Sequence, residues 1–217
     1  MKFRDRTKIP KFLEENPVPQ QDGDASQYPM IRTQSLRSYY FDLADSPINF
    51  DIALGDWGVS SWTTKHLCDL IQPVALRSPE VLIGAPWDWT TDWWNLGPVI
   101  LEVFRGVAMF TGQEGKDSPY DAKLHLQEIG GFFGPFPRSL LDKGDPEMVK
   151  EVFNEDGTVK DSGPSGRPPL NSEYWIEDLR EETRNQFVDF LYALMKLDPA
   201  ERLSTQALID MPWMQGE

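Results

Sequence analysis

The triplet Asp56-Trp57-Gly58 is the first part of the sequence whose residue types could do chemistry. A carboxylate that follows a strand can hold Mg²⁺, and a glycine two residues later lets the backbone turn beside the ion. The apolar–polar alternation of residues 48–54 predicts such a strand, which ends at Gly55. The same D-x-G pattern also begins at Asp142 and Asp161, so the triplet alone has little specificity. Whether the triplet is a metal-binding motif must be judged from the motifs that follow it in the sequence.

Three further motifs follow the triplet in order, at residues 78–80, 92–97 and 197–202. They are Ser78-Pro79-Glu80, Asp92-Trp93-Trp94-Asn95-Leu96-Gly97 and Leu197-Asp198-Pro199-Ala200-Glu201-Arg202. The series D-x-G, [AS]-P-E, D-x-W-x-x-G and L-D-P-x-x-R resembles the C-terminal lobe of eukaryotic protein kinases. Four motifs in the right order make this resemblance specific.

Within that family, residues 48–217 resemble the SR-protein kinases, which phosphorylate serines in Arg-Ser-rich segments, and the resemblance extends to fungal members. The residues that carry it are Trp62, Lys65-His66, Ile71-Gln72, Arg77-Ser78, Glu80-Val81-Leu82, the segment 125–141 and Met211-Pro212-Trp213-Met214. The resemblance implies a mainly α fold, a helical bundle with a short β-hairpin or strand before the D-x-G turn. It also implies that the N-terminal lobe of a kinase is absent from this chain.

The same resemblance divides the chain into two regions. Residues 1–47 are a polar, partly irregular N-terminal arm or insert, and residues 48–217 are the kinase C-lobe. Within the C-lobe we expect the activation segment at 56–80. A loop-rich insert is expected at 142–175, where Gly, Pro and Asp are frequent.

Individual roles follow from the resemblance, residue by residue. Asp56 would bind the Mg²⁺ that bridges the ATP phosphates. Glu80 and Arg202 would form a buried ion pair that ties the activation segment to the last helices, and Asp92 would accept backbone N–H bonds from the catalytic loop. A shelf beneath the substrate residue that follows the phosphorylated serine would consist of Pro73, Val74, Ala75 and Leu76.

Several parts of a kinase are missing from the sequence. Phosphoryl transfer needs a Gly-rich loop over the phosphates, a strand lysine and a catalytic loop of H-R-D-x-x-x-x-N type. None of these occurs here, so no catalytic residue is assigned: the base aspartate and the strand lysine are not in this chain. ATP and Mg²⁺ are the cofactors that the family implies. We expect this chain alone to bind them weakly or not at all, and to be catalytically incomplete.

Charge and composition restrict the partners. Twenty-one Lys and Arg against thirty-five Asp and Glu give a net charge of -14, which disfavours direct contact with nucleic acid or an anionic membrane. The most apolar stretch, 96–110, is interrupted by Glu102 and Arg105, so no membrane span is predicted. A single cysteine, Cys68, indicates a reducing compartment. We therefore predict an intracellular protein, in the cytoplasm, the nucleus or both.

Two functional hypotheses remain open. In the first, the chain is part of a serine/threonine kinase that phosphorylates basic, Arg/Ser-rich protein segments with ATP, and the missing N-lobe belongs to the same protein. In the second, it is a stand-alone pseudokinase fragment, an acidic protein-interaction module that holds such basic segments without phosphorylating them.

Hydrophobic periodicity predicts the elements that must position these residues. Helices are expected at 9–15, 98–109, 120–129, 182–197 and 204–211. The stripe of Val99, Ile100, Val103, Phe104 and Val107 is expected to face the core in the second helix. Gly130-Gly131 is expected to stop the third helix, and Ser204 to cap the last.

Overall fold

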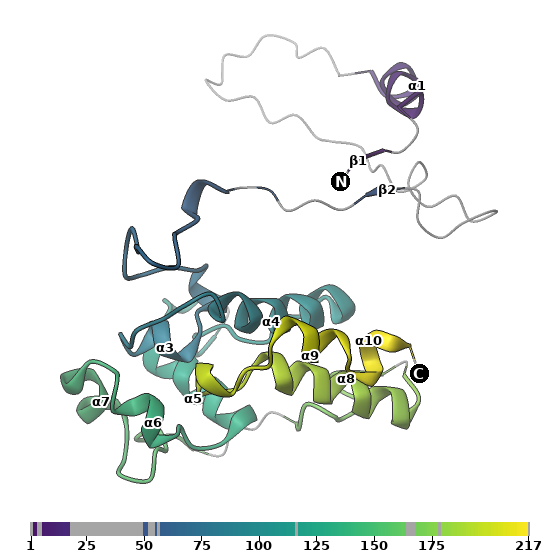
Figure 1. The fold of residues 1–217 in the computed structure, drawn as a ribbon. Coiled ribbons are helices and arrows are strands. Elements are labelled where there is room, and N and C mark those ends of the chain that lie inside the picture. The colour runs from purple at the N-terminus through teal and green to yellow at the C-terminus, as the bar shows by residue number, and fades with distance from the viewer. Residues whose placement is uncertain are drawn as a thin grey trace. The chain divides into compact units, whose positions relative to one another are not determined.

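A computed structural model of the protein describes residues 2–3, 6–17, 50–51, 55, 57–115, 117–163, 168–177 and 179–216. The chain forms two compact units, Met1–Ser60 and Ser61–Glu217, and each is described by itself (Figure 1). Asp56 and residues 52–54 of the predicted strand lie outside the described residues.

The described residues of the first unit form two short strands and one α-helix. Strand β1 (Lys2–Phe3) pairs antiparallel with β2 (Phe50–Asp51), in a register that places Phe3 opposite Phe50. The β2 strand lies within the predicted strand 48–54, whereas β1 was not predicted. Helix α1 (Lys8–Glu15) confirms the helix expected at 9–15, and it ends at Asn16, ahead of Pro17. A single 3₁₀ turn follows at Trp57–Val59.

The second unit is built from helices, which confirms the mainly α prediction for the described part of the chain. Its helices are α3 (Pro79–Leu82), α4 (Thr91–Arg105), α5 (Ala122–Phe133), α6 (Arg138–Leu141), α7 (Pro146–Val152), α8 (Glu181–Leu194), α9 (Thr205–Ile209) and α10 (Pro212–Gln215). Helices α4 and α8 lie side by side, while α6 and α7 lie at the end of the unit away from α10 (Figure 1).

Helix α4 corrects the predicted direction of its apolar stripe. The helix begins at Thr91, seven residues before the predicted start, and ends at Gly106, whose φ of 69° is the left-handed conformation that closes a helix. Trp94 and Leu101 on its core side are completely buried, whereas Val103 is 82% exposed. The prediction was wrong because it counted from Pro98. The first two turns, with Trp94 and Gly97, set which side faces the core.

Helix α5 runs through the two glycines that were expected to stop it. It continues to Phe133 and ends at Gly134, where φ is 82°. A Cβ at Gly130 would lie 3.5 Å from the ring of Phe136, an ordinary van der Waals contact. The Gly130-Gly131 stop is therefore wrong: both glycines keep helical backbone inside α5.

The segment expected to be rich in loops contains an unpredicted helix and part of the core. Helix α7 begins after Asp145, whose side chain accepts a hydrogen bond from the Met148 amide. A bridge between Phe153 and Val159 then folds the chain back on itself, and both side chains are buried. The apolar residues of the segment 142–175 are spaced too irregularly to show the period of a helix or a strand, so the sequence did not indicate these elements.

The C-terminal helices follow the predicted pattern with shorter bounds. Helix α8 ends at Leu194, three residues before the predicted end, and buries Phe187 and Leu191. Ser204 is the N-cap of α9 and accepts a hydrogen bond from the amide of Ala207 at 3.3 Å, which confirms the predicted cap. Helix α9 ends at Ile209, two residues before the predicted end, and α10 begins at Pro212, beyond the predicted helix.

Candidate substrate-binding and ion-pair site

Glu80 and Arg202 form a buried, two-pronged ion pair. Glu80 lies in the first turn of α3, and Arg202 directly follows a 3₁₀ turn at Pro199–Glu201. Arg202 Nη1 donates to Glu80 Oε1 at 2.6 Å, and Nη2 donates to Oε2 at 2.7 Å. Both side chains have no exposed surface. The structure thus joins the two residues that the resemblance expects to pair.

Arg202 also holds three other parts of the second unit. Its Nη1 donates to the Thr90 carbonyl at 3.1 Å, and its Nε donates to the Lys196 carbonyl at 3.0 Å. The guanidinium carbon lies 5.5 Å from the centre of the Trp94 ring, within the range of a cation–π contact. Four hydrogen bonds, two of them to the Glu80 carboxylate, therefore compensate the buried charge.

Gln72 fixes the segment that leads to Glu80. Its backbone φ is 70°, a conformation that non-glycine residues rarely adopt. The side chain compensates: Nε2 donates to the Thr91 carbonyl at 2.9 Å, while Oε1 accepts from the Ser78 amide at 2.9 Å and from the Ser78 hydroxyl at 3.1 Å. Sequence reasoning gave Gln72 no such role, since a left-handed glutamine has no local signal.

The four residues of the expected shelf form a tight turn on the surface. Val74–Leu76 is a 3₁₀ turn, and the Leu76 amide donates to the Pro73 carbonyl at 2.8 Å. Pro73 and Val74 are exposed, and Ala75 is half-buried. Arg77 turns away and donates from Nε to the Ile71 carbonyl at 3.3 Å. The turn therefore presents an uncharged, largely apolar surface.

The segment before this turn is held by an aromatic pair. The His66 ring stacks on Trp87 with 3.6 Å between ring centres and an angle of 4° between the ring planes. Trp87 Nε1 also donates to the Asp69 carbonyl at 3.0 Å. Trp87 thereby anchors residues 66–69 to the rest of the second unit. The sequence did not indicate this contact.

The roles expected for the other two predicted site residues, Asp56 and Asp92, stay predictions. Asp56 lies outside the described residues. Asp92 lies at the start of α4, and partial burial of its carboxyl raises its pKa above 3.8. No described residue donates a hydrogen bond to that carboxyl, so the acceptor role expected for Asp92 has no partner within the described part of the chain.

Asp198 is a site residue that sequence reasoning missed, because the L-D-P-x-x-R motif served to recognise the family and only its arginine was given a role. Burial acts to raise the pKa of its carboxyl, but hydrogen bonds from the Ser139 hydroxyl and the Ala200 amide, with the charges of Lys143 and Arg202, outweigh it. The pKa therefore lies below 3.8. Asp198 stays charged and pulls the turn before Arg202 onto α6.

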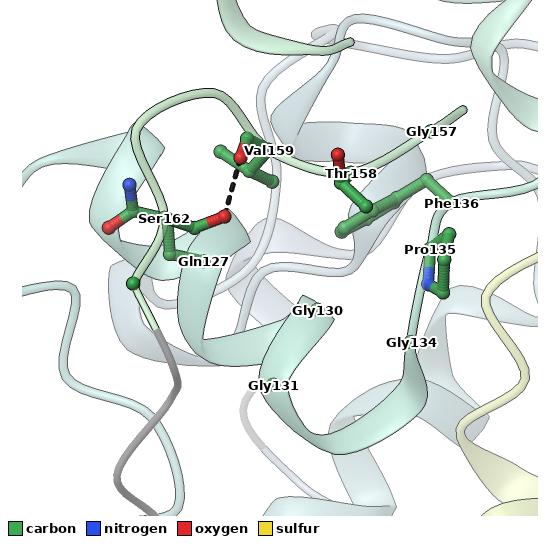
Figure 2. Close-up of a pocket in the computed structure, with 11 residues that line it drawn as sticks. Gln127, Gly130, Gly131, Gly134, Pro135, Phe136, Gly157, Thr158, Val159 and Ser162 are labelled. Carbon is green, nitrogen blue, oxygen red and sulfur yellow. Dashed lines mark hydrogen bonds between the residues drawn. The ribbon is translucent and has the colours of Figure 1, made fainter. Parts of the chain in front are cut away.

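A neutral pocket of about 270 Å³ lies between α5 and the loop at 157–163 (Figure 2). Glycines line much of it, including Gly130, Gly134 and Gly163, and Phe136 and Val159 form its buried wall. The Ser162 hydroxyl is turned onto the Val159 carbonyl at 2.5 Å. Among the described residues, no charged side chain lines the pocket.

The described residues contain neither a cluster of metal ligands nor a membrane-spanning helix. They contain no group of three or more His, Cys, Asp or Glu side chains placed to hold a metal ion. No helix among them is long and apolar enough to cross a membrane.

The helical fold is consistent with the C-lobe of a protein kinase, and comparison with known families shows which family the chain belongs to. The protein kinase domain family matches residues 41–214, so the chain belongs to the protein kinase family. The match begins inside the segment 1–47, which was expected to be an arm.

Individual relatives narrow the similarity to SR-protein kinases. The chain is 29% identical over 180 residues to the serine/threonine-protein kinase SKY1 of Saccharomyces cerevisiae, covering 79% of this chain and 23% of the relative. It is 29% identical over 166 residues to the serine/threonine-protein kinase SRPK of Physarum polycephalum, covering 75% and 38%. A serine/threonine protein kinase of Aspergillus fumigatus is 31% identical over 144 residues, covering 66% and 35%. The chain spans less than two fifths of each of these three relatives.

Proposed function

We propose that this chain is the substrate-binding, C-terminal part of a serine/threonine kinase that phosphorylates basic, Arg/Ser-rich protein segments. The observation that carries the proposal is the Glu80–Arg202 pair, which ties α3 to the segment that follows the 3₁₀ turn at Pro199–Glu201. With Gln72 it holds the turn of Pro73–Leu76 in one shape, as a platform for a substrate backbone requires.

The outer face of α4 supports a role within a larger catalytic domain. Leu96, Val99 and Val103 follow one another at helical spacing and are exposed, and Asp92 lies one turn before them. An apolar stripe that begins with an unpartnered, partly buried carboxyl is suited to receive another segment. We propose that this face receives the catalytic loop and the chain around it, with Asp92 as acceptor of its backbone N–H groups.

The chemistry itself needs groups beyond those in this chain. ATP would supply the phosphoryl group and Mg²⁺ would neutralise its phosphate charge. Asp56 is the residue we propose to bind the metal, because a carboxylate is the ligand that such a hard cation prefers. The charge of -14 attracts an arginine-rich segment from solution. Without a base aspartate, a strand lysine or a phosphate-covering loop, residues 1–217 alone are proposed to be inactive and to bind ATP weakly or not at all.

A chimaera tests the proposal. Residues 41–214 replace the matching part of the SKY1 kinase of Saccharomyces cerevisiae, and phosphate transfer from ATP to an Arg-Ser peptide is measured. We expect activity from the chimaera and none from residues 1–217. Asp56→Ala should abolish the activity, whereas Asp142→Ala, at the second D-x-G triplet, should leave it unchanged.

A folded but inactive chimaera would contradict the kinase proposal and favour the second hypothesis, an acidic interaction module. The high negative charge is the observation that favours that alternative. Its own test is the binding of an unphosphorylated Arg-Ser peptide to residues 1–217 without ATP. Binding that is tight at physiological salt and unaffected by Asp56→Ala would support the module.

A further inference from the structure

A second hollow, here called the α6–α7 hollow, lies on the far side of the helical unit from α10. It encloses about 560 Å³ between α6, α7 and the turn that follows α7. Its floor is apolar, with Leu141 and Phe153 buried and Val149 half-buried. The floor can therefore take up an apolar side chain of a ligand.

Three basic side chains, those of Arg138, Lys150 and Lys160, line the hollow, although the chain as a whole is strongly acidic. Arg138 and Lys150 are exposed, and neither forms an ion pair with a carboxylate of any described residue. Lys160 donates from Nζ to the Lys150 carbonyl at 2.6 Å, at the C-terminal end of α7, where a positive charge is favoured. The hollow thus presents two uncommitted cations and one whose position is fixed.

The hollow is preformed by close packing beneath it. A Cβ at Gly144, in the α6–α7 turn, would lie 3.0 Å from Ile83 and from Val149, so the turn fits only glycine without displacing them. The Asp145 amide donates to the Ile83 carbonyl at 2.7 Å. Because the turn is fixed to α3 in this way, a ligand would meet α6 and α7, which carry Arg138 and Lys150, already in place.

We propose that the α6–α7 hollow binds a phosphorylated peptide segment whose phosphoserine or phosphothreonine is next to an apolar side chain. Arg138 and Lys150 bind the phosphate, since guanidinium and ammonium groups form charge-assisted hydrogen bonds with its oxygens. The apolar side chain lies on Leu141 and Phe153.

Two carboxylates limit what else can bind. Asp142 and Glu155 also line the hollow, and they would repel a ligand with many negative charges such as a polyacidic chain or nucleic acid. A peptide with one phosphate and an apolar neighbour brings the least repulsion and uses the floor as well. The site is therefore suited to a phosphopeptide, and it does not depend on catalysis by this chain.

Fluorescence anisotropy with the full 217-residue chain tests the proposal. The probes are a labelled Gly-Ser-Gly-Phe-pSer-Gly-Ser-Gly peptide and its unphosphorylated form. We expect the phosphorylated peptide to bind at least about tenfold more tightly, and the difference to shrink with added salt. In the double variant Arg138→Glu, Lys150→Glu we expect that preference to be lost.

Lys196→Glu is the matched control, because Lys196 is exposed, forms no ion pair with a described residue and does not line the hollow. It should leave the affinity within about twofold. If the double glutamate variant does not fold, Arg138→Gln, Lys150→Gln takes its place. Equal affinity for the two peptides, undiminished binding by the double variant, or displacement of the phosphopeptide by AMP at a similar concentration would each overturn the proposal.

Discussion

Glu80 and Arg202, 122 residues apart in the sequence, meet through two hydrogen bonds of 2.6 and 2.7 Å in the interior of the second unit. Around this pair, Thr90 and Lys196 contribute their carbonyl groups and Trp94 its ring face. The pair therefore joins α3, the N-cap of α4 and the residues that follow α8. Cutting it should affect the whole helical unit.

Loss of one partner leaves the other charge buried and unpaired. Arg202→Leu is therefore expected to lower the free energy of unfolding by about 3–5 kcal/mol, and Glu80→Gln to destabilise in the same direction. Urea denaturation followed by circular dichroism measures this. Lys123→Ala, which breaks the exposed pair with Asp161, is the control and should shift the midpoint far less. An Arg202→Leu variant as stable as the parent would contradict the role given to the pair.

The orientation of α4 gives a second prediction, because the two residues that flank Glu102 differ completely in burial. Leu101 is fully buried and Val103 is 82% exposed. Leu101→Ala should cost about 2–5 kcal/mol of unfolding free energy, whereas Val103→Ser should change it by no more than about 0.5 kcal/mol. Thermal and urea unfolding of the two variants decide the matter. A Val103→Ser variant as destabilised as Leu101→Ala would mean that the stripe faces the core after all.

The ion pair and the orientation of α4 also show how far the sequence could predict the structure. The resemblance expects Glu80 to pair with Arg202, a long-range contact that no local pattern contains, and the structure joins the two side chains. Periodicity predicted a helix at 98–109 but not which of its sides faces the core. That side is set by the packing of Trp94 and Gly97 against the rest of the unit. Gln72 was missed for the same reason: its φ of 70° is stabilised by Thr91 and Ser78, which only the folded chain brings near.

The contact between Gly97 and Met195 gives a third prediction. A Cβ at Gly97 would lie 2.5 Å from Met195 Cγ and 2.6 Å from Sδ, so the methionine would have to move. Met195 has no exposed surface. Gly97→Ala is expected to cost about 1–3 kcal/mol by overpacking, reduced by about 1 kcal/mol of gained helix propensity.

A double-mutant cycle isolates this contact. Met195→Ala creates a cavity by itself, but the alanine at 97 should partly fill it. The double variant should therefore be more stable than the sum of the single effects predicts. Additive effects would show that Gly97 and Met195 do not press on each other.

The lowered pKa of Asp198 predicts a stability that depends on pH. Since the folded pKa lies below 3.8, the carboxylate contributes stability that is complete well above pH 3.8. That contribution is lost as the pH falls through 3.8 toward the folded pKa. Carbon-13 NMR of the Asp198 carboxyl measures the pKa directly, and Ser139→Ala should raise it by removing a donor. Ser162→Ala, whose hydroxyl donates to a carbonyl instead, should leave it unchanged.

Asp92 gives the last prediction, with opposite effects on stability and activity. Partial burial raises its folded pKa above 3.8, so the charged carboxyl costs stability at neutral pH, and this cost disappears as the pH falls through the folded pKa. Asp92→Asn should therefore stabilise residues 1–217 at pH 7, with an advantage that fades toward pH 3.8. In the active SKY1 chimaera the same change should lower the phosphorylation rate, because the amide replaces a charged acceptor for backbone N–H groups. A variant that is stabilised in the chain alone and fully active in the chimaera would remove Asp92 from the site.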